Sequence, residues 1–424
     1  METRRVGIAS SLVRLRRASL LAMTSCGIKR SSVIARRPSR LRDGRRSNLV
    51  VFAGSLNTPD SMTAALGTFC RWLLVVVIAA VPAAAGAVDT DTGGRYPSFW
   101  RDGSLRAQVL AGIEATGNDR YVLAESLFTN LSQRFPESPV GPLFVAGTIQ
   151  AHMLDCESSE RYTEFRVWLT ETERRARALI ELDIAVGEAE FALGAAAGYD
   201  AVYESHWGGW FAALKKAMRA NGHFRAALAA DSGFFDAYLG IGNYNYWKSA
   251  GTGLLRWLPF IPDTRERGLQ QMLTAAQRGT LALQAARASL ATALLHEEQY
   301  AEALAHADTL AARLPEAKSP LWIMAQADFK LYRWEAARDL YEEIERRILL
   351  VGPGNYYNLI ECAYYRARCD FEDGRWRDAL TECRRALAYP APGEVRDRQE
   401  DKLNDLRKLQ ERLKRLVATT SQQK

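Results

Sequence analysis

One pattern of small and aromatic residues occurs four times in this 424-residue sequence, and it limits the fold more than any other feature. The four copies centre on Ala124, Ala303, Ala337 and Ala379. A glycine or alanine stands twelve residues before each of these alanines, an aromatic residue stands three before, and apolar or aromatic residues follow four and seven after. These spacings predict two helices whose small residues let their backbones approach closely.

The repeated pattern resembles the tetratricopeptide repeat (TPR) family, in which a unit of 34 residues forms two antiparallel helices. Ala303 and Ala337 are 34 residues apart, and Pro136, Pro315 and Pro390 follow where the second helix of a unit would end. Proline has no N–H for the helical hydrogen-bond ladder, so it ends a helix. The resemblance implies an all-α protein built as a right-handed α-solenoid of TPR-like helical hairpins.

Helical periodicity extends the repeat to seven predicted helix pairs. They make up a solenoid at 104–392, which follows a linker at 88–103 and precedes a C-terminal capping helix at 393–418 with leucines on one face. The predicted pairs are 104–135, 140–182, 186–230, 233–279, 280–315, 319–349 and 356–390.

Two of these pairs fit the pattern only if the loop between their helices is lengthened. In both, small residues are expected to form the seam between the helices. The expected seam of the first joins Gly194 to Trp210, Ala213, Ala217 and Ala220, and that of the second joins Gly240 to Gly268, Met272 and Ala275.

Residues 62–87 have the layout of a secretory signal peptide. One arginine precedes an apolar run at 72–81, and the small residues 85–87 fit the rule for signal peptidase cleavage. The apolar run is much shorter than the ~20 residues needed to cross a bilayer, so cleavage before Val88 is favoured over a membrane anchor. We therefore expect an exported bacterial protein, periplasmic or secreted.

Basic residues are concentrated ahead of this segment. Residues 1–50 contain thirteen Lys and Arg and two acidic residues, so they account for more than the whole net charge of +7, and the rest of the chain is slightly acidic. A slightly acidic body argues against nucleic acid as a partner. Two interpretations of residues 1–61 are open: either Met62 is the true initiator, or the segment is a disordered basic arm or targeting leader.

The sequence lacks the motifs that accompany catalysis, cofactors or metals. Its five histidines form no H-E-x-x-H motif, and Cys362 and Cys369 lack the C-x-x-C spacing and the nearby histidine of a zinc site. We therefore expect neither an enzyme nor a bound cofactor or metal. In an oxidising compartment the four cysteines after Val88 are open to two interpretations, disulfide pairing or burial as small apolar residues.

In the TPR family the first helix of each pair lines a concave groove, so the resemblance implies a binding surface on those helices. Aromatic side chains interleaved with Lys, Arg and Gln suit an extended peptide. The alternative is that these residues only seal neighbouring repeats. The groove residues expected from their positions are Tyr199, Tyr244, Trp322, Gln326, Phe329, Lys330, Tyr364 and Arg368.

The segment at 254–261 is unusually apolar for a loop, and it contains Trp257, Leu258 and Phe260. Apolar loops are seldom left in water. Two interpretations are open: the loop folds back into the groove as an internal plug, or it contacts a partner or a membrane surface.

Two functions follow from these features. The favoured one is an exported TPR scaffold that binds a protein or peptide, of unidentified sequence, in its groove. The alternative is a helical-repeat carrier or enzyme with a pocket for a small ligand, such as a glycan or lipid, near Tyr244, Trp257 and Trp322.

Overall fold

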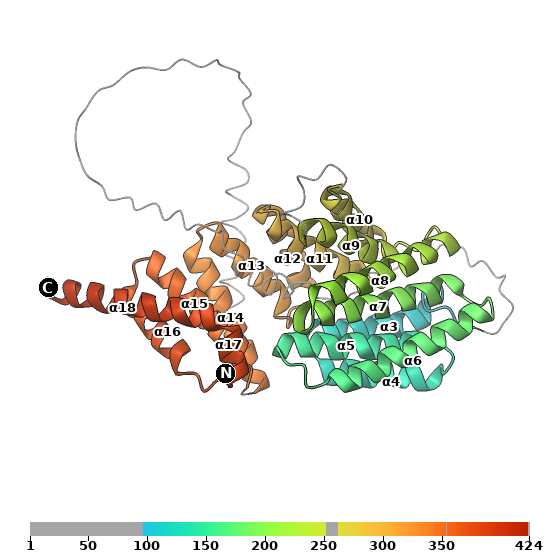
Figure 1. Ribbon diagram of the computed structural model, residues 1–424, viewed down its shortest axis with the longest axis horizontal. Helices are drawn as coiled ribbons and strands as arrows, with labels where there is room; N and C mark the ends of the chain where they lie inside the picture. Colours follow the sequence, from blue (N-terminus) through green and yellow to red (C-terminus); the bar gives the residue numbers. More distant parts are fainter. Residues whose placement is uncertain (1–95, 252–261, 353, 423–424) are drawn as a thin grey trace, which may run out of the picture. The chain divides into compact units, whose positions relative to one another are not determined.

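The structure is a computed structural model, and it describes residues 96–251, 262–352 and 354–422 (Figure 1). These residues form sixteen helices, α3 to α18, without a strand among them, which confirms the predicted all-α class. No helix in this part of the chain is long and apolar enough to cross a bilayer. The predicted leader and signal peptide, and Trp257, Leu258 and Phe260, lie outside the described residues.

From α3 to α16 the helices pack in chain order, each against the next, and α16 then packs against α18 (Figure 1). The fold is thus an array of sequential helix pairs. The helices are α3 (Gly103–Gly117), α4 (Tyr121–Arg134), α5 (Val140–Cys156), α6 (Tyr162–Glu181), α7 (Val186–Trp207), α8 (Trp210–Ala230), α9 (Ala237–Gly251), α10 (Arg265–Arg278), α11 (Leu283–His296), α12 (Tyr300–Arg313), α13 (Ser319–Lys330), α14 (Trp334–Val351), α15 (Tyr356–Glu372), α16 (Trp376–Ala388), α17 (Gly393–Arg398) and α18 (Glu400–Gln422).

The small residues of the repeat pattern lie where the paired helices touch. Ala303, Ala337 and Ala379 are fully buried. A Cβ atom on Gly112 of α3 would lie 2.6 Å from the ring of Phe128 on α4, which is inside van der Waals contact. The pattern therefore marks close contacts between helices, as the sequence predicts.

The turn inside a pair has the same backbone conformation in the four units that carry the pattern. Asp119, Glu298, Tyr332 and Gly374 each lie five residues before the central alanine, and each has a φ between 60° and 75°. Only glycine adopts this left-handed conformation without steric cost. Because three different L-residues accept it at the same place, the packing of the two helices dictates the turn geometry.

The contact between α9 and α10 differs from the expected seam. Gly242, rather than Gly240, faces α10, and a Cβ atom on Gly242 would lie 2.8 Å from the carbonyl oxygen of Gly268. Gly240 faces α8, where a Cβ atom would lie 1.9 Å from the ring of Phe224. A step of two residues along an α-helix rotates the side-chain direction by about 200°. Gly240 and Gly242 therefore face helices on opposite sides of α9.

The C-terminal segment forms two helices where the sequence predicts one capping helix at 393–418. The division falls at Gln399, between α17 and α18. The buried side-chain amide of Gln399 donates to the Tyr357 carbonyl and to Glu361, each over 3.1 Å. Leu406 of α18 packs in a cluster with residues of α15 and α16, so α18 covers the last helix pair.

Late elements of the array contact early ones. Lys318, just before α13, donates to Asp119 over 2.7 Å and lies 3.1 Å from Asp155. Asn355 and Asn358, at the start of α15, both donate to the Asp155 carbonyl oxygen over 2.8 Å. These contacts connect the first two helix pairs with the sixth and seventh.

A second buried ion group ties the end of α5 to later helices. Glu157 lies 2.9 Å from the His206 ring nitrogen of α7 and pairs with Arg398 of α17. The side chains of Glu157 and His206 are only 2% and 3% exposed. Burial makes such charged contacts specific to one arrangement of the helices, because separating them would leave a charge without compensation.

The cysteines of the described residues form no disulfide bond with one another. Cys362, Cys369 and Cys383 are buried, and Cys156 is half-buried. Burial raises the pKa of Cys369 and of Cys383 to about 12, so both thiols stay neutral. They serve as small apolar residues in the packing of α14, α15 and α16.

Candidate functional site

The candidate site is a pocket of about 240 Å³ lined by residues of α5, α7, α8, α9 and α11. Helices α7, α8 and α9 lie side by side (Figure 1). Short segments immediately before α9 and α11 complete the lining. The pocket thus belongs to three successive helix pairs together with α5, and no single pair could form it.

Small side chains make up much of the lining that α7 and α8 contribute. A Cβ atom on Gly198 of α7 would meet no atom within 4 Å, so open space adjoins the backbone there. Side chains this short leave space unfilled where no larger side chain from a neighbouring helix reaches in. The small lining residues of the two helices are Ala195, Gly198, Ala201, Ala213, Ala217 and Ala220.

The structure corrects the expected seam between α7 and α8 at this point. Gly194 lies against Phe224 of α8, where a Cβ atom would be 2.9 Å from the ring. Ala213, Ala217 and Ala220, which the sequence assigns to the same seam, line the pocket. Small residues let helices approach, but they also leave a cavity where no larger side chain reaches across. Sequence spacing does not distinguish the two outcomes.

Two tyrosines predicted from the sequence, Tyr199 and Tyr244, both line this pocket. Tyr199 of α7 lies against Gly147 of α5, whose Cβ position is 2.8 Å from the Tyr199 hydroxyl oxygen. Burial raises the pKa of Tyr199, so the hydroxyl stays protonated. Tyr244 of α9 also lines the pocket, and the Lys248 ammonium lies 5.2 Å from its ring centroid in a cation–π contact.

Polar side chains of the lining bind neighbouring protein groups. Asp236 accepts from the Trp100 indole over 2.5 Å and from three backbone N–H groups at 280–282 over 2.7 to 3.2 Å. Burial raises the pKa of Asp236, and these donors oppose the rise. The Asn243 amide donates to the Ser289 hydroxyl over 3.3 Å. These groups connect helices, and the pocket offers a ligand mainly apolar contact.

The other predicted groove residues lie elsewhere, and none of them lines this pocket. Trp322 is 7% exposed, and its ring centroid lies 5.8 Å from that of Tyr341. It is therefore part of the packing between α13 and α14. The predicted residues outside the pocket are Trp322, Gln326, Phe329 and Lys330 on α13 and Tyr364 and Arg368 on α15.

Several of these residues pack on their own neighbours. The ring of Phe329 lies 5.2 Å from Trp334 and 5.1 Å from Tyr365, centroid to centroid. Arg368 donates to the Tyr364 hydroxyl over 3.0 Å. The structure thus separates the eight predicted residues into two in the pocket and six on α13 and α15.

Sequence reasoning missed most of the pocket, including Gly198, Trp210 and Trp247. A signal was present in the run LGAAAG at 193–198 and in the alanines of α8. Two neighbouring helices that both present small residues to each other over several turns leave volume unless an aromatic residue fills it. This signal would indicate a cavity, without fixing its size.

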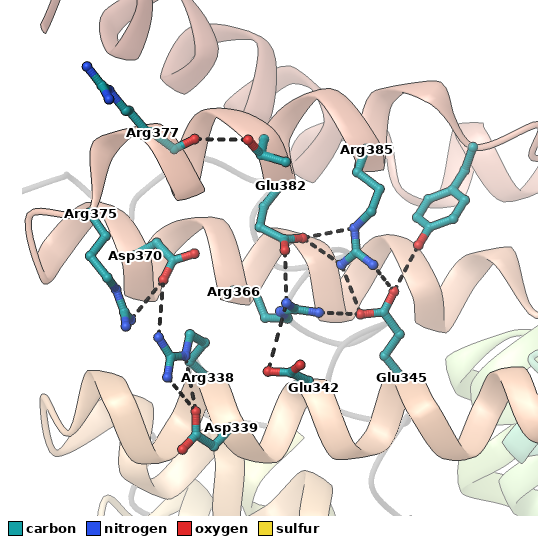
Figure 2. Close-up of polar contacts among 12 residues, drawn as sticks. Arg338, Asp339, Glu342, Glu345, Arg366, Asp370, Arg375, Arg377, Glu382 and Arg385 are labelled. Carbon is teal, nitrogen blue, oxygen red and sulfur yellow. Dashed lines mark hydrogen bonds and ion pairs between the residues drawn. The ribbon is translucent and has the colours of Figure 1, made fainter. Parts of the chain in front are cut away.

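A cluster of charged side chains outside the pocket links α14, α15 and α16 (Figure 2). Arg366 lies between Glu345, at 2.5 Å, and Glu382, at 3.0 Å. Arg385 pairs with the same two carboxylates, and the Tyr389 hydroxyl donates to Glu345 over 3.1 Å. Two acids and two guanidinium groups thus balance one another, which suits a structural role between helices.

The described residues contain no group of three or more His, Cys, Asp or Glu placed to hold a metal ion. Comparison of the chain with known protein families and with curated proteins gives no match.

Proposed function

We propose that this protein is a binding protein that carries an apolar ligand with a hydrocarbon chain in the pocket between α7, α8 and α9. The observation that carries the proposal is the lining of small residues that leaves open space beside Gly198. The alternative function predicted from the sequence is a carrier or enzyme with a small-ligand pocket. The present proposal specifies a lipid-like ligand and binding without catalysis.

The chemistry of the lining favours an acyl chain over a glycan. A buried glycan needs a hydrogen-bond partner for each hydroxyl, because an unpaired polar group inside a protein is costly. Asp236 and Asn243 already bond to protein groups. An acyl chain needs only apolar contact, and each buried methylene contributes about 0.8 kcal/mol, so eight would contribute roughly 6 kcal/mol before the cost of ordering the chain.

The peptide-scaffold function has less support. Its expected residues do not form one surface with the pocket, and Trp322 and Phe329 pack within the α13 to α15 region. A peptide could still reach the exposed Lys330, but a single exposed lysine does not define a binding surface.

We further propose that the helix pairs form a TPR-like right-handed solenoid in an exported protein. The buried alanines and the repeated left-handed turn support the TPR assignment. Export rests on the sequence at 62–87 alone. Neither point is needed for the binding proposal, which depends on the pocket.

The test is titration of the full chain with cis-parinaric acid, a fluorescent fatty acid, followed by displacement with palmitate. Gly198→Leu introduces a side chain into the pocket, and we expect it to weaken binding by about tenfold or more, which is at least ~1.4 kcal/mol. Gly222→Leu is the matched control, since Gly222 is an exposed glycine of α8 with no atom within 4 Å of its Cβ position. Equal affinity of both variants, or no saturable binding by the parent, would refute the proposal.

A further inference from the structure

Apolar and basic side chains share one outward face of α8. Phe211 is 81% exposed and Met218 is 55% exposed, values that are uncommon for such large apolar side chains. Lys215 is exposed between them. The spacing of four and three residues places all three on the same helix face.

This face is continuous with the mouth of the pocket. Trp210 lines the pocket, is 38% exposed, and packs edge-on against Phe211 with ring centroids 4.9 Å apart. Its indole nitrogen lies 3.4 Å from the Cβ position of Gly251, another lining residue. One aromatic side chain thus contacts both the interior of the pocket and the exposed face.

The charge of α8 is of one sign. The helix contains Lys215, Lys216, Arg219 and Arg225, and no Asp or Glu. Lys216 is neutralised by Asp200 and Glu204 of α7, and Arg219 lies 3.3 Å from Glu173. Lys215 and Arg225 remain as exposed cations of the outward side.

We infer that the outward face of α8, formed by Trp210, Phe211, Lys215 and Met218, binds an anionic lipid surface and there exchanges ligand with the pocket. The inference rests on the proposed function, because direct transfer between a membrane and the pocket spares an acyl ligand the cost of exposing its chain to water. Tryptophan and phenylalanine partition into the membrane interface, and neighbouring lysines are attracted by anionic headgroups.

The face fits a lipid surface better than a protein partner for two reasons. Its aromatic residues adjoin a pocket whose lining suits acyl chains. Its charge complements anionic headgroups, with no acidic residue on the helix to oppose the contact. Binding should therefore weaken with salt.

The test is sedimentation of the full chain with vesicles of equal parts phosphatidylcholine and phosphatidylglycerol, and with vesicles of phosphatidylcholine alone. We expect binding to the anionic vesicles and about tenfold weaker binding after the double change Phe211→Ser and Met218→Ser. The matched control is Val167→Ser with Leu182→Ser, which removes two apolar side chains, 62% and 67% exposed, outside α8. This control should bind like the parent. Lys215→Glu should weaken binding to the anionic vesicles only.

The outcomes separate the two proposals. If the parent protein binds cis-parinaric acid but sediments with neither kind of vesicle, the inference is overturned and the proposed function stands. Vesicle binding that the double change at α8 does not weaken also overturns it. If the parent protein sediments with vesicles but binds no fatty acid, both the proposed function and the ligand exchange at the membrane are overturned. A dimer in solution that the double change dissociates, without vesicle binding, assigns the face to contact between copies of this chain and overturns the inference.

Discussion

Lys318 donates a 2.7 Å hydrogen bond to Asp119, which precedes it by 199 residues. Asp155 lies 3.1 Å from the same ammonium, whose side chain is 5% exposed. Burial and the nearby Asp119 raise the pKa of Asp155, and Lys318 opposes the rise. One buried cation thus balances two acids and links the first two helix pairs to the start of α13.

Replacing Lys318 with Met should destabilise the protein by about 3–5 kcal/mol, since it leaves the largely buried carboxylates of Asp119 and Asp155 without their cation. Urea denaturation followed by circular dichroism measures the change. The loss should be larger at pH 8 than at pH 5, because Asp155, with its raised pKa, takes up a proton at the lower pH.

The control for this prediction is Arg120→Met. Arg120 pairs with Glu316 at the same junction, but both side chains are 52% exposed. We expect a change within about 1 kcal/mol. Equal effects of the two substitutions would show that burial of Lys318 contributes nothing.

Two acids on α14 should differ sharply although they lie three residues apart. Glu345→Ala removes the carboxylate that pairs with Arg366 and Arg385, and should cost about 3 kcal/mol. Glu342→Ala removes a 60% exposed carboxylate that lies 4.0 Å from Arg366, and should change stability by less than about 1 kcal/mol. Thermal denaturation of both variants is the measurement, and a Glu345 variant as stable as the parent would contradict a structural role for the cluster.

Glu188 of α7 should make stability fall with rising pH. Burial raises its pKa from 4.5 to about 7, while the Ser98 hydroxyl donates to its carboxylate and opposes the rise. Between these pH values the folded protein holds a proton that the unfolded chain has released. The contribution of Glu188 is therefore present below pH 4.5 and lost as pH rises through about 7.

The variant Glu188→Gln tests this dependence, because its side chain is neutral at every pH. The loss of stability between pH 5 and pH 8 should be smaller in the variant, by on the order of 3 kcal/mol at most. Urea denaturation at several pH values provides the profile. Parallel profiles for parent and variant would mean that Glu188 titrates as it does in the unfolded chain.

Glycines that face a helix and glycines that face open space should respond in opposite directions. Gly242→Ala would bring a methyl group to 2.8 Å from the Gly268 carbonyl oxygen, so we expect a loss of about 1–3 kcal/mol. Gly222→Ala meets no atom within 4 Å and should gain about 0.5–1 kcal/mol, because alanine favours the helix. Thermal denaturation measures the stability of both variants. A Gly242→Ala variant as stable as the parent would refute the close approach of α9 and α10.

The sequence by itself determined the all-α class and much of the helix pairing. Its information is local: a period of 3.6 residues identifies a helix face, and the size of a side chain decides how closely two backbones approach. Ala303, Ala337 and Ala379 were placed at buried contacts on these grounds alone. The sequence also predicts Tyr199 and Tyr244 as groove-facing positions of first helices, and both line the pocket.

Only the tertiary structure decided which small residues form a seam and which line a cavity. The sequence assigns Gly194 and Ala213 to the same seam of small residues, yet Gly194 contacts Phe224 and Ala213 faces the pocket. The difference depends on which side chains reach these positions from other helices. The contact of Lys318 with Asp119 likewise has no local period, since it arises from the accumulated angles of many helix pairs. Helix faces are set within a few turns of chain, whereas cavities and distant ion pairs are set by how the helices are packed together.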